Sequence, residues 1–300
     1  MKWPESVTIK EVGPRDGLQN EKAWVKTEDK ISWINQLSLT GLKHVEITSF
    51  VNPKWIPALA DASDVVKGIQ RVPGVVYTAL VPNSRGLEKA LEANVDEVAV
   101  FMSASQTHNR KNINKSIEDT FSVLEEVVQD ALSAGKSVRG YISTVFGCPY
   151  EGLVSVENVV RISNTLFDMG IKEISLGDTI GVANPIQVQK VLEDLLRRFP
   201  AKKLAMHFHD TRGMALANIL SSLDMGISTF DAAIGGLGGC PYAPGASGNV
   251  ASDDLLYMLE GMGIQTGIDR EKMHEAALFI QERLGKSLPS HTLQACGTDS

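Results

Sequence analysis

The stretch Leu204-Ala205-Met206-His207-Phe208-His209-Asp210 decides the fold of this 300-residue chain. Side chains alternate along an extended strand, so His207 and His209 point the same way. Their backbone positions are roughly 6.6 to 6.8 Å apart along the strand. The apolar residues around the two histidines, and Gly213 after them, place the pair at the end of a buried strand, just before a helix. Catalytic groups lie at such strand ends in a closed parallel α/β barrel.

Seven more apolar or β-branched runs recur along the chain, separated by segments with helical periodicity such as residues 117–132 and 188–199. The eight predicted strands are residues 7–12, 44–50, 75–81, 97–102, 137–145, 173–178, 203–209 and 229–234. This alternation predicts a (β/α)8 TIM barrel, with residues 1–300 as a single catalytic domain. Extra C-terminal helices are expected near residues 253–260 and 271–284, followed by a loose tail over residues 293–300.

Capping residues mark several helix ends. Thr27 and the pair Asn184-Pro185 have side chains suited to a helix start. Glycines end the helices before the fifth, sixth and eighth strands, since a left-handed residue is least costly for glycine. These glycines are Gly135, Gly170 and Gly226.

Composition excludes several classes of protein. The net charge of -7 argues against a nucleic acid or an anionic membrane as the main partner. The chain has no apolar signal segment and no run of about 18 apolar residues, so we expect a soluble cytoplasmic protein. Its three cysteines are too few for a disulfide scaffold; we assign Cys148 to packing, and Cys296 is either idle or part of a regulatory disulfide.

Polar residues gather where the predicted strands end, and a barrel would bring them to one mouth. Two imidazoles with a carboxylate and an amide oxygen leave two positions of an octahedron free, which suits Mg²⁺ or Mn²⁺. Core histidines satisfied by backbone groups are the alternative, but two on one strand face favour metal. The collected residues are Arg15, Asp16, Glu46, Arg139, Tyr141, Asp178, His207, His209, Cys240 and Asn249.

Single members of this set have plainer interpretations. Asp16 could be a turn carboxylate beside Gly17, and Arg15 could be a surface cation. Glu46 on an apolar strand needs a partner, and Arg15 is the one we predict.

Two further segments also allow two interpretations each. The glycine-rich segment 235–242 is either a mobile cover that brings Cys240 over the metal or a structural turn with an incidental cysteine. A basic segment is either a solvated helix entrance or a contact for the phosphates of a bulky thioester. Its residues are His108, Arg110, Lys111 and Lys115.

Five segments together resemble the 3-hydroxy-3-methylglutaryl-CoA lyases, within the metal-dependent lyases and Claisen-type synthases. They are GPRDGLQNE (13–21), VEITSF (45–50), SLGDTIG (175–181), HFHDTRG (207–213) and GGLGGCPYAPGASGN (235–249). The resemblance covers nearly the whole chain, and the last segment is the most specific, because the related synthases as a rule lack this cysteine loop.

The resemblance implies that Asp16, His207, His209 and Asn249 bind the divalent cation. It also implies that Arg15, Glu46 and Cys240 are catalytic, and it implies cleavage of 3-hydroxy-3-methylglutaryl-CoA to acetyl-CoA and acetoacetate, as in leucine degradation and ketone-body formation. Arg15, Arg139, Tyr141 and Asp178 are expected to bind the acyl-CoA substrate, and a homodimer is expected from the family. For the hydroxyl proton, Asp16 and His207 both stay open as the accepting base.

Three alternatives remain. A synthase that condenses an acyl-CoA with a 2-oxo acid would use the same metal site. An aldolase of 4-hydroxy-2-oxo acids would give Cys240 no evident task. A barrel that binds a thioester without turnover is the third alternative, and fold alone does not exclude it.

Overall fold

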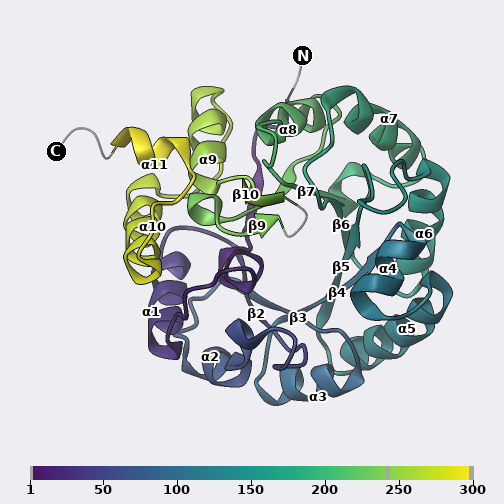
Figure 1. The fold of residues 1–300 in the computed structure, drawn as a ribbon, viewed down its shortest axis with the longest axis horizontal. Helices are drawn as coiled ribbons and strands as arrows, with labels where there is room; N and C mark the ends of the chain where they lie inside the picture. Colours follow the sequence, from purple (N-terminus) through teal and green to yellow (C-terminus); the bar gives the residue numbers. More distant parts are fainter. Residues whose placement is uncertain (1–2, 241–242, 297–300) are drawn as a thin grey trace.

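Eight parallel strands close into a barrel, and helices surround it (Figure 1). Each strand pairs with the next, and β8 pairs with β1. The computed structural model describes residues 3–240 and 243–296, and of residues 240, 243–247 and 296 it describes the backbone alone. The strands are β1 (Thr8–Glu11), β2 (His44–Ser49), β3 (Val76–Leu80), β4 (Glu97–Ser103), β5 (Ser137–Ser143), β6 (Glu173–Asp178), β7 (Leu204–Phe208) and β8 (Thr229–Ala232). The predicted barrel is confirmed.

Eight helices follow the strands, and all of them except α4 bury apolar side chains in the core. They are α1 (Thr27–Ser38), α2 (Ala62–Gly68), α3 (Ser84–Glu92), α4 (Gln106–Ile113), α5 (Ile117–Ser133), α6 (Val156–Asp168), α7 (Pro185–Leu196) and α8 (Ala215–Asp224). Short helical turns lie at η1 (Gly13–Gly17), η2 (Pro57–Leu59), η3 (Ala201–Lys203) and η4 (Ile234–Gly236). In α1, Trp33, Ile34 and Leu37 are fully buried, which shows how the helical period builds the core.

The predicted helix ends hold with one exception. Asn184 caps α7 in a reciprocal capping box with Gln187, and Pro185 takes the first position. Gly135, Gly170 and Gly226 all have positive φ, as a left-handed helix end requires. Thr27 does not cap α1: Lys26 holds that position, and the Thr27 hydroxyl instead donates to Asp61 at 2.8 Å.

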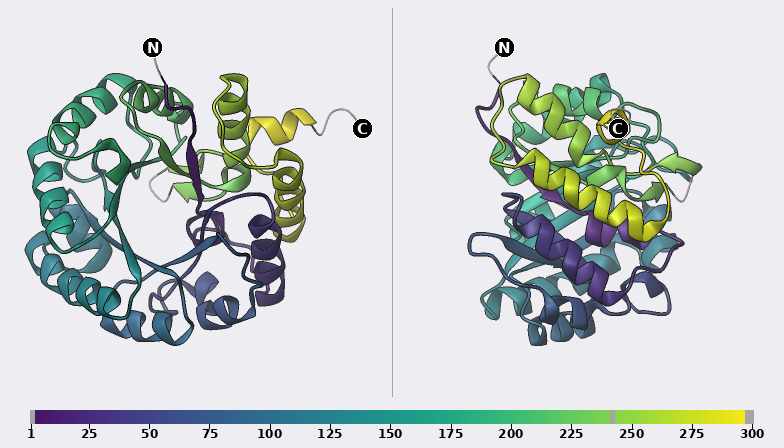
Figure 2. Two further views of the ribbon diagram at one scale, coloured as in Figure 1. Left: turned by 180° about the vertical axis from the view of Figure 1, so that it is seen from behind. Right: turned by 90° about the vertical axis from the view of Figure 1, so that its left-hand side faces the viewer.

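The chain after the barrel is more ordered than the sequence predicts. Helix α9 (Ser252–Gly261) and helix α10 (Arg270–Leu284) lie where expected, and α10 lies beside α1 (Figure 2), with Arg283 Nε 2.9 Å from Asp29 Oδ1. The loose tail predicted from residue 293 is wrong for its first part, because α11 (His291–Cys296) is helical and Leu293 is buried. Residues 297–300 lie outside the described part of the chain.

The glycine-rich segment after β8 also has regular structure. It forms η4 and then the antiparallel pair β9 (Gly239–Cys240) and β10 (Ala243–Ser247), where the sequence predicts a loop. Cys240 is thus the last residue of β9, and residues 241–242, between β9 and β10, lie outside the described part of the chain.

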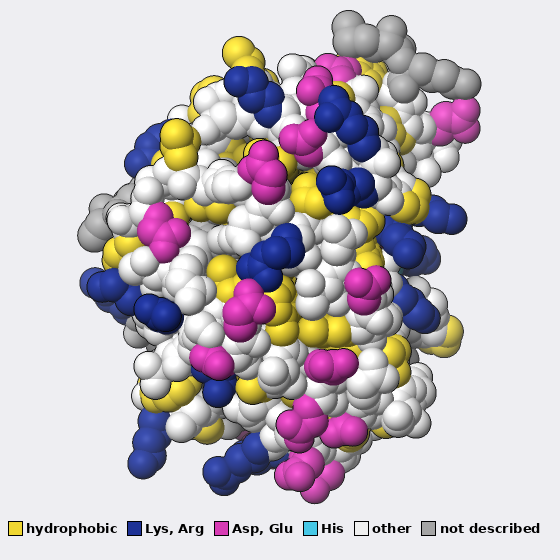
Figure 3. All heavy atoms as spheres, turned by 90° about the vertical axis from the view of Figure 1, so that its right-hand side faces the viewer, with side chains coloured by type: hydrophobic (Ala, Val, Ile, Leu, Met, Phe, Trp, Pro, Cys, Tyr) yellow, Lys and Arg dark blue, Asp and Glu magenta, His cyan; other side chains and the backbone are white. Residues whose placement is uncertain are grey.

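The surface over the α4 to α7 side carries basic and acidic side chains intermixed (Figure 3), so this face offers no continuous basic field for a polyanion. Within residues 3–240 and 243–296, the helices are all too short or too polar to cross a bilayer.

Candidate active site

The turn after β1 presents two adjacent charged side chains. The backbone N–H groups of Arg15, Asp16 and Gly17 all donate to the carbonyl of Val12, at 3.2, 2.7 and 3.3 Å. This wide π-type turn is a geometry often found at functional sites. It needs Gly13, because a Cβ there would lie 2.6 Å from Glu11 Oε1. Arg15 and Asp16 therefore leave the carboxyl end of β1 together.

Three potential metal ligands meet at this end of the barrel. One ligand atom from each of Asp16, His207 and His209 lies within 4.8 Å of the others. Nε2 of His207 is 3.9 Å from Oδ2 of Asp16. Two ligands of one ion at roughly 2.1 Å lie roughly 3 to 4.2 Å apart, so this spacing suits a shared cation.

Asn249 offers a fourth potential ligand. Its amide group donates to Asp16 Oδ2 at 2.9 Å and to the Leu237 carbonyl at 3.0 Å. Its amide oxygen, like Nδ1 of His209, is buried and has no hydrogen-bond partner among the described residues. Since buried acceptors are rarely left unpaired, these orphan atoms fit a metal site. β7 ends at Phe208, so His209 lies one residue beyond the strand, in an isolated bridge with Asn249.

Arg15 and Glu46 form the predicted ion pair. Arg15 Nη2 lies 3.0 Å from Glu46 Oε2, and the hydroxyl of Tyr141 donates to the same oxygen at 2.6 Å. The other arm of the guanidinium contacts Asp16. Arg15 is only 6% exposed, so it is not a surface cation.

These charges set the ionisation of Asp16. Burial by itself raises the pKa of Asp16, but Arg15, His207 and His209 together lower it to about 2. Burial likewise lowers the pKa of Arg15, and the carboxylates of Glu46 and Asp16 raise it above its usual range. Asp16 is therefore an anion near neutral pH, as a metal ligand must be.

A cavity of about 920 Å³ opens over these groups. Arg15, Asp16, Tyr141, His207 and His209 line one part of it. Arg85 and Lys89 of α3, together with His108 and Lys115, line another part. The volume is at the upper end of small-molecule pockets, so a long, partly anionic ligand suits it.

Comparison with known proteins agrees with this arrangement. The profile of the HMGL-like family matches residues 6–280. The chain belongs to the HMGL-like family. A curated hydroxymethylglutaryl-CoA lyase of Bacillus subtilis is 63% identical over 98% of both chains, and the mitochondrial hydroxymethylglutaryl-CoA lyase of Rattus norvegicus is 52% identical over 97% of this chain and 90% of that protein.

Solved structures of HMGL-like proteins have the same fold. The crystal structure of a Bacillus subtilis HMG-CoA lyase matches with a TM-score of 0.98 and 62% identity, covering 99% of this chain and all of that one (100%). An HMG-CoA lyase from Acinetobacter baumannii, solved with coenzyme A and 3-methylmalate, matches with a TM-score of 0.94 and 41% identity, covering 100% of this chain and 98% of that one.

Two residues predicted to bind substrate do not reach the cavity of this HMGL-like protein. The carboxylate of Asp178 accepts the backbone N–H groups of Val182 and Ala183 at 2.9 and 3.0 Å and so holds the loop after β6. Arg139 donates to Glu173, Tyr141 and Asp231, which uses all three of its nitrogens. Both side chains are buried and absent from the cavity wall, so they organise the site from behind.

Of the three cysteines, the structure describes the side chain of Cys148 alone. Cys148 is buried, and its thiol donates to Ser105 Oγ at 2.9 Å, which confirms the packing assignment. The backbone of Cys240 lies in β9, but its side chain is outside the described part, as is that of Cys296.

The residues of the basic segment lie in two different environments. His108 and Lys115 line the cavity, whereas Lys111 lies 4.6 Å from the ring centre of Tyr150, and Arg110 is exposed on α4. Arg85 and Lys89, which were not predicted from the sequence, share the cavity wall with His108 and Lys115. Arg85 and Lys89 are four residues apart on α3, a spacing that puts them on one helix face.

Two buried carboxylates near the site, Glu11 and Asp231, were also not predicted from the sequence. Glu11 accepts backbone N–H groups of Gly13 and Ile234 and the hydroxyl of Ser252, so it joins the turn after β1 to the segment after β8. Asp231 contacts His207, Arg139 and Ser175. The signal in both cases is an acid inside an apolar strand, the same signal that singled out Glu46.

Proposed function

We propose that this enzyme cleaves 3-hydroxy-3-methylglutaryl-CoA to acetyl-CoA and acetoacetate. The similarity to curated hydroxymethylglutaryl-CoA lyases over 98% of both chains carries the proposal. The chain is thus a carbon–carbon lyase, and the site chemistry suits that reaction. The hydroxyl proton leaves, the C2–C3 bond breaks, C3 becomes the ketone of acetoacetate, and C2 takes a proton to become the methyl group of acetyl-CoA.

Asp16, His207, His209 and Asn249 would hold a divalent cation, Mg²⁺ or Mn²⁺. Two oxygen and two imidazole donors suit these ions and leave positions for substrate oxygens. When bound, such a cation lowers the pKa of the substrate hydroxyl and fixes its orientation. The orphan amide oxygen of Asn249 supports this set, because a ligand oxygen must have a free lone pair.

Arg15 would stabilise the negative charge that develops on the thioester oxygen. Its guanidinium is held by Glu46 and Asp16 before substrate binds, so little reorganisation is needed during the reaction. Tyr141, which donates to Glu46, fixes the partner of Arg15 and lines the cavity. Cys240 would donate the proton that turns the enolate into acetyl-CoA.

The nucleotide of the acyl-CoA would lie against the basic part of the cavity wall. Arg85, Lys89 and Lys115 provide three cations there, and phosphates are their natural partners. A relative was solved with coenzyme A bound. We further propose a cytoplasmic homodimer in which residues 1–300 form one catalytic domain.

Product formation tests the proposal directly. The purified enzyme is incubated with 3-hydroxy-3-methylglutaryl-CoA and Mg²⁺, and acetoacetate and acetyl-CoA are measured separately. Equal amounts of both products, lost in EDTA, are expected. Absence of cleavage by enzyme that binds metal would overturn the proposal and direct attention to 2-oxo acid substrates.

A further inference from the structure

Asp231 on β8 lies at the centre of buried contacts that the proposed chemistry leaves unused. Its side chain is 1% exposed and does not line the cavity. Oδ1 accepts from Arg139 Nη2 at 2.5 Å, while Oδ2 accepts from Ser175 Oγ at 2.6 Å and lies 3.2 Å from His207 Nδ1. Asp231 therefore cannot reach substrate, but it contacts a proposed metal ligand from behind.

The contact with Asp231 fixes which nitrogen of His207 carries the proton. An ionised carboxylate only accepts hydrogen bonds, so the hydrogen must reside on Nδ1 of His207. The neutral ring then has its lone pair on Nε2, the nitrogen that lies 3.9 Å from Asp16 Oδ2. A histidine ligand needs its lone pair directed at the metal, and carboxylates behind such rings commonly set this tautomer.

We propose that Asp231 is the positioning residue that sets the tautomer and ring orientation of His207 for metal binding. The inference rests on the proposed metal site, although not on the identity of the acyl group. His209 offers an internal contrast, because its Nδ1 has no partner among the described residues. Of the two imidazoles, His207 is the one with a carboxylate behind it.

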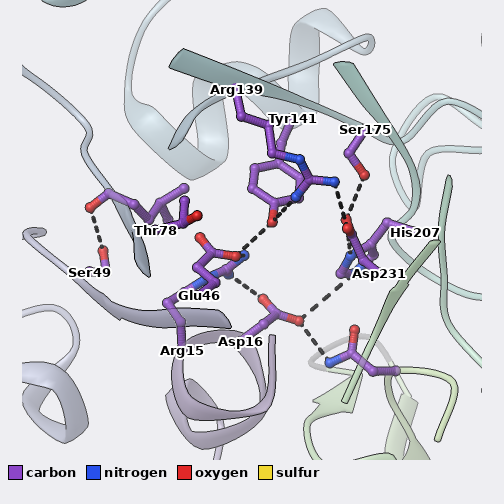
Figure 4. Close-up of polar contacts among 12 residues, drawn as sticks. Arg15, Asp16, Glu46, Ser49, Thr78, Arg139, Tyr141, Ser175, His207 and Asp231 are labelled. Atoms are coloured by element: carbon purple, nitrogen blue, oxygen red, sulfur yellow. Dashed lines mark hydrogen bonds and ion pairs between the residues drawn. The ribbon is translucent and has the colours of Figure 1, made fainter. Parts of the chain in front are cut away.

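The same carboxylate reaches the thioester side of the site through Arg139. Nη1 of Arg139 donates to the Tyr141 hydroxyl at 2.6 Å, and that hydroxyl donates to Glu46, the partner of Arg15. Figure 4 shows these side chains converging around the site. We call this set the charged ring: Arg15, Asp16, His207, Asp231, Arg139, Tyr141 and Glu46. Asp231 thus joins the metal side to the Arg15 side.

The Asp231→Asn variant tests the proposal through metal affinity alone. An amide keeps the volume of the side chain, but it cannot accept from Arg139, Ser175 and His207 together. Mn²⁺ is titrated into substrate-free enzyme, and free Mn²⁺ is followed by electron paramagnetic resonance. The dissociation constant should rise roughly 10- to 100-fold, the usual effect of losing such a support. A folded variant with parental affinity would overturn the proposal.

Glu173→Gln is the matched control. Glu173 also pairs with Arg139, 2.7 Å from its Nε, and among the described residues it makes no hydrogen bond or ion pair with His207. The control disturbs the same buried guanidinium, so a general weakening of the network would lower metal affinity in both variants. Parental Mn²⁺ affinity in Glu173→Gln is expected, and an equal loss in both would overturn a specific action through His207.

A second measurement needs no change at Asp231. Enzyme with ¹⁵N-labelled histidine is studied without metal, and His207 is assigned with the His207→Gln variant, whose spectrum lacks the signals of that ring. The ring should carry its proton on Nδ1; a proton on Nε2 would overturn the proposal even if Asp231→Asn fails to fold. Neither readout uses substrate, so a failure of thioester cleavage would leave both results interpretable.

Discussion

The guanidinium of Arg15 and the carboxylate of Glu46 form a buried ion pair, with Nη2 3.0 Å from Oε2. Arg15 comes from the turn after β1 and Glu46 from β2, and Tyr141 on β5 donates to the same oxygen. Side chains from three parts of the barrel therefore fix one cation. A charge held in place before the reaction begins is the most effective stabiliser of a developing anion.

Arg15→Lys should keep the positive charge and lose the planar guanidinium that contacts two carboxylates. A lysine ammonium cannot contact Glu46 and Asp16 in the geometry of a planar guanidinium. We expect kcat to fall roughly 100-fold, the scale seen when one oxyanion contact is removed, with a smaller change in KM. Steady-state kinetics measure this. Arg161→Lys, which alters an exposed pair with Glu118, is the control and should have parental kcat. Parental kcat in Arg15→Lys would show that the planar guanidinium is not needed for the reaction.

Cys148 and Cys240 each lie in a Gly-Cys-Pro-Tyr sequence, at residues 147–150 and 239–242, and this allows a paired test of the two cysteines. Cys240→Ser should abolish most cleavage, because a hydroxyl is a far weaker acid than a thiol. Cys148→Ser should cost stability with little loss of kcat, since Cys148 is buried against Ser105. Equal kcat losses in the two variants, in assays of product formation, would remove Cys240 from the mechanism.

Metal removal should lower stability as well as activity. Ligand that binds only the folded state adds about 2.7 kcal/mol at 100 times its dissociation constant, so the melting temperature should rise with Mg²⁺ concentration. In His209→Gln this rise should be much smaller, because one of the three clustered ligands is lost. Thermal melts with EDTA and with increasing Mg²⁺ measure it. A rise of the same size in His209→Gln would show that the stabilising ion binds elsewhere.

Glu11 should make stability fall as pH rises. Burial raises the pKa of Glu11 from 4.5 to about 7, although hydrogen bonds from Ser252, Ile234 and Gly13 oppose it. The folded state therefore binds more protons than the unfolded state between these values, and the free energy of unfolding decreases with pH across this window. Asp253, with its pKa raised to about 6 by burial, acts in the same direction.

Glu11→Gln should remove the contribution of Glu11. The amide oxygen can accept from Gly13 and Ile234, and the amide nitrogen can donate to the Ser252 hydroxyl. Relative to the parent, the variant should gain up to about 3 kcal/mol between pH 5 and pH 8. Urea unfolding at both values measures the gain. An identical pH dependence in the two proteins would show that Glu11 is ionised at no cost.

Charge reversal in the basic part of the cavity wall should weaken substrate binding. Arg85→Glu and Lys89→Glu are expected to raise KM for the acyl-CoA by roughly 10-fold or more, because each reverses a charge near the phosphates, while kcat stays close to parental. The effect should weaken at high salt. Lys67→Glu on α2, exposed and away from the cavity wall, is the control. Unchanged KM in the α3 variants would place the nucleotide elsewhere.

Periodicity predicted the barrel, because alternating strands and amphipathic helices form a parallel sheet covered by helices, and eight such units are the number that closes a barrel. The Arg15–Glu46 pair followed from the cost of an isolated buried carboxylate. The roles of Arg139 and Asp178 did not follow, since a strand position does not tell whether a side chain faces the cavity or a neighbouring strand. The role of Asp231 was not predicted for a related reason. Its partners lie on other strands, and only the register of β7 and β8 sets His207 opposite it.

The charged ring also has an electrical consequence. Two guanidinium groups, from Arg15 and Arg139, face three carboxylates of the ring, from Asp16, Glu46 and Asp231. Glu173, which also pairs with Arg139, is balanced by Lys10, so the metal-free site carries one surplus negative charge. A divalent cation reverses this to one surplus positive charge, which the free carboxylate of a substrate acid would cancel. Buried sites favour electroneutrality, so cation and carboxylate should each tighten the binding of the other. A thioester without that second acid group would leave the site unbalanced, and the enzyme would select substrates by charge count as well as by shape.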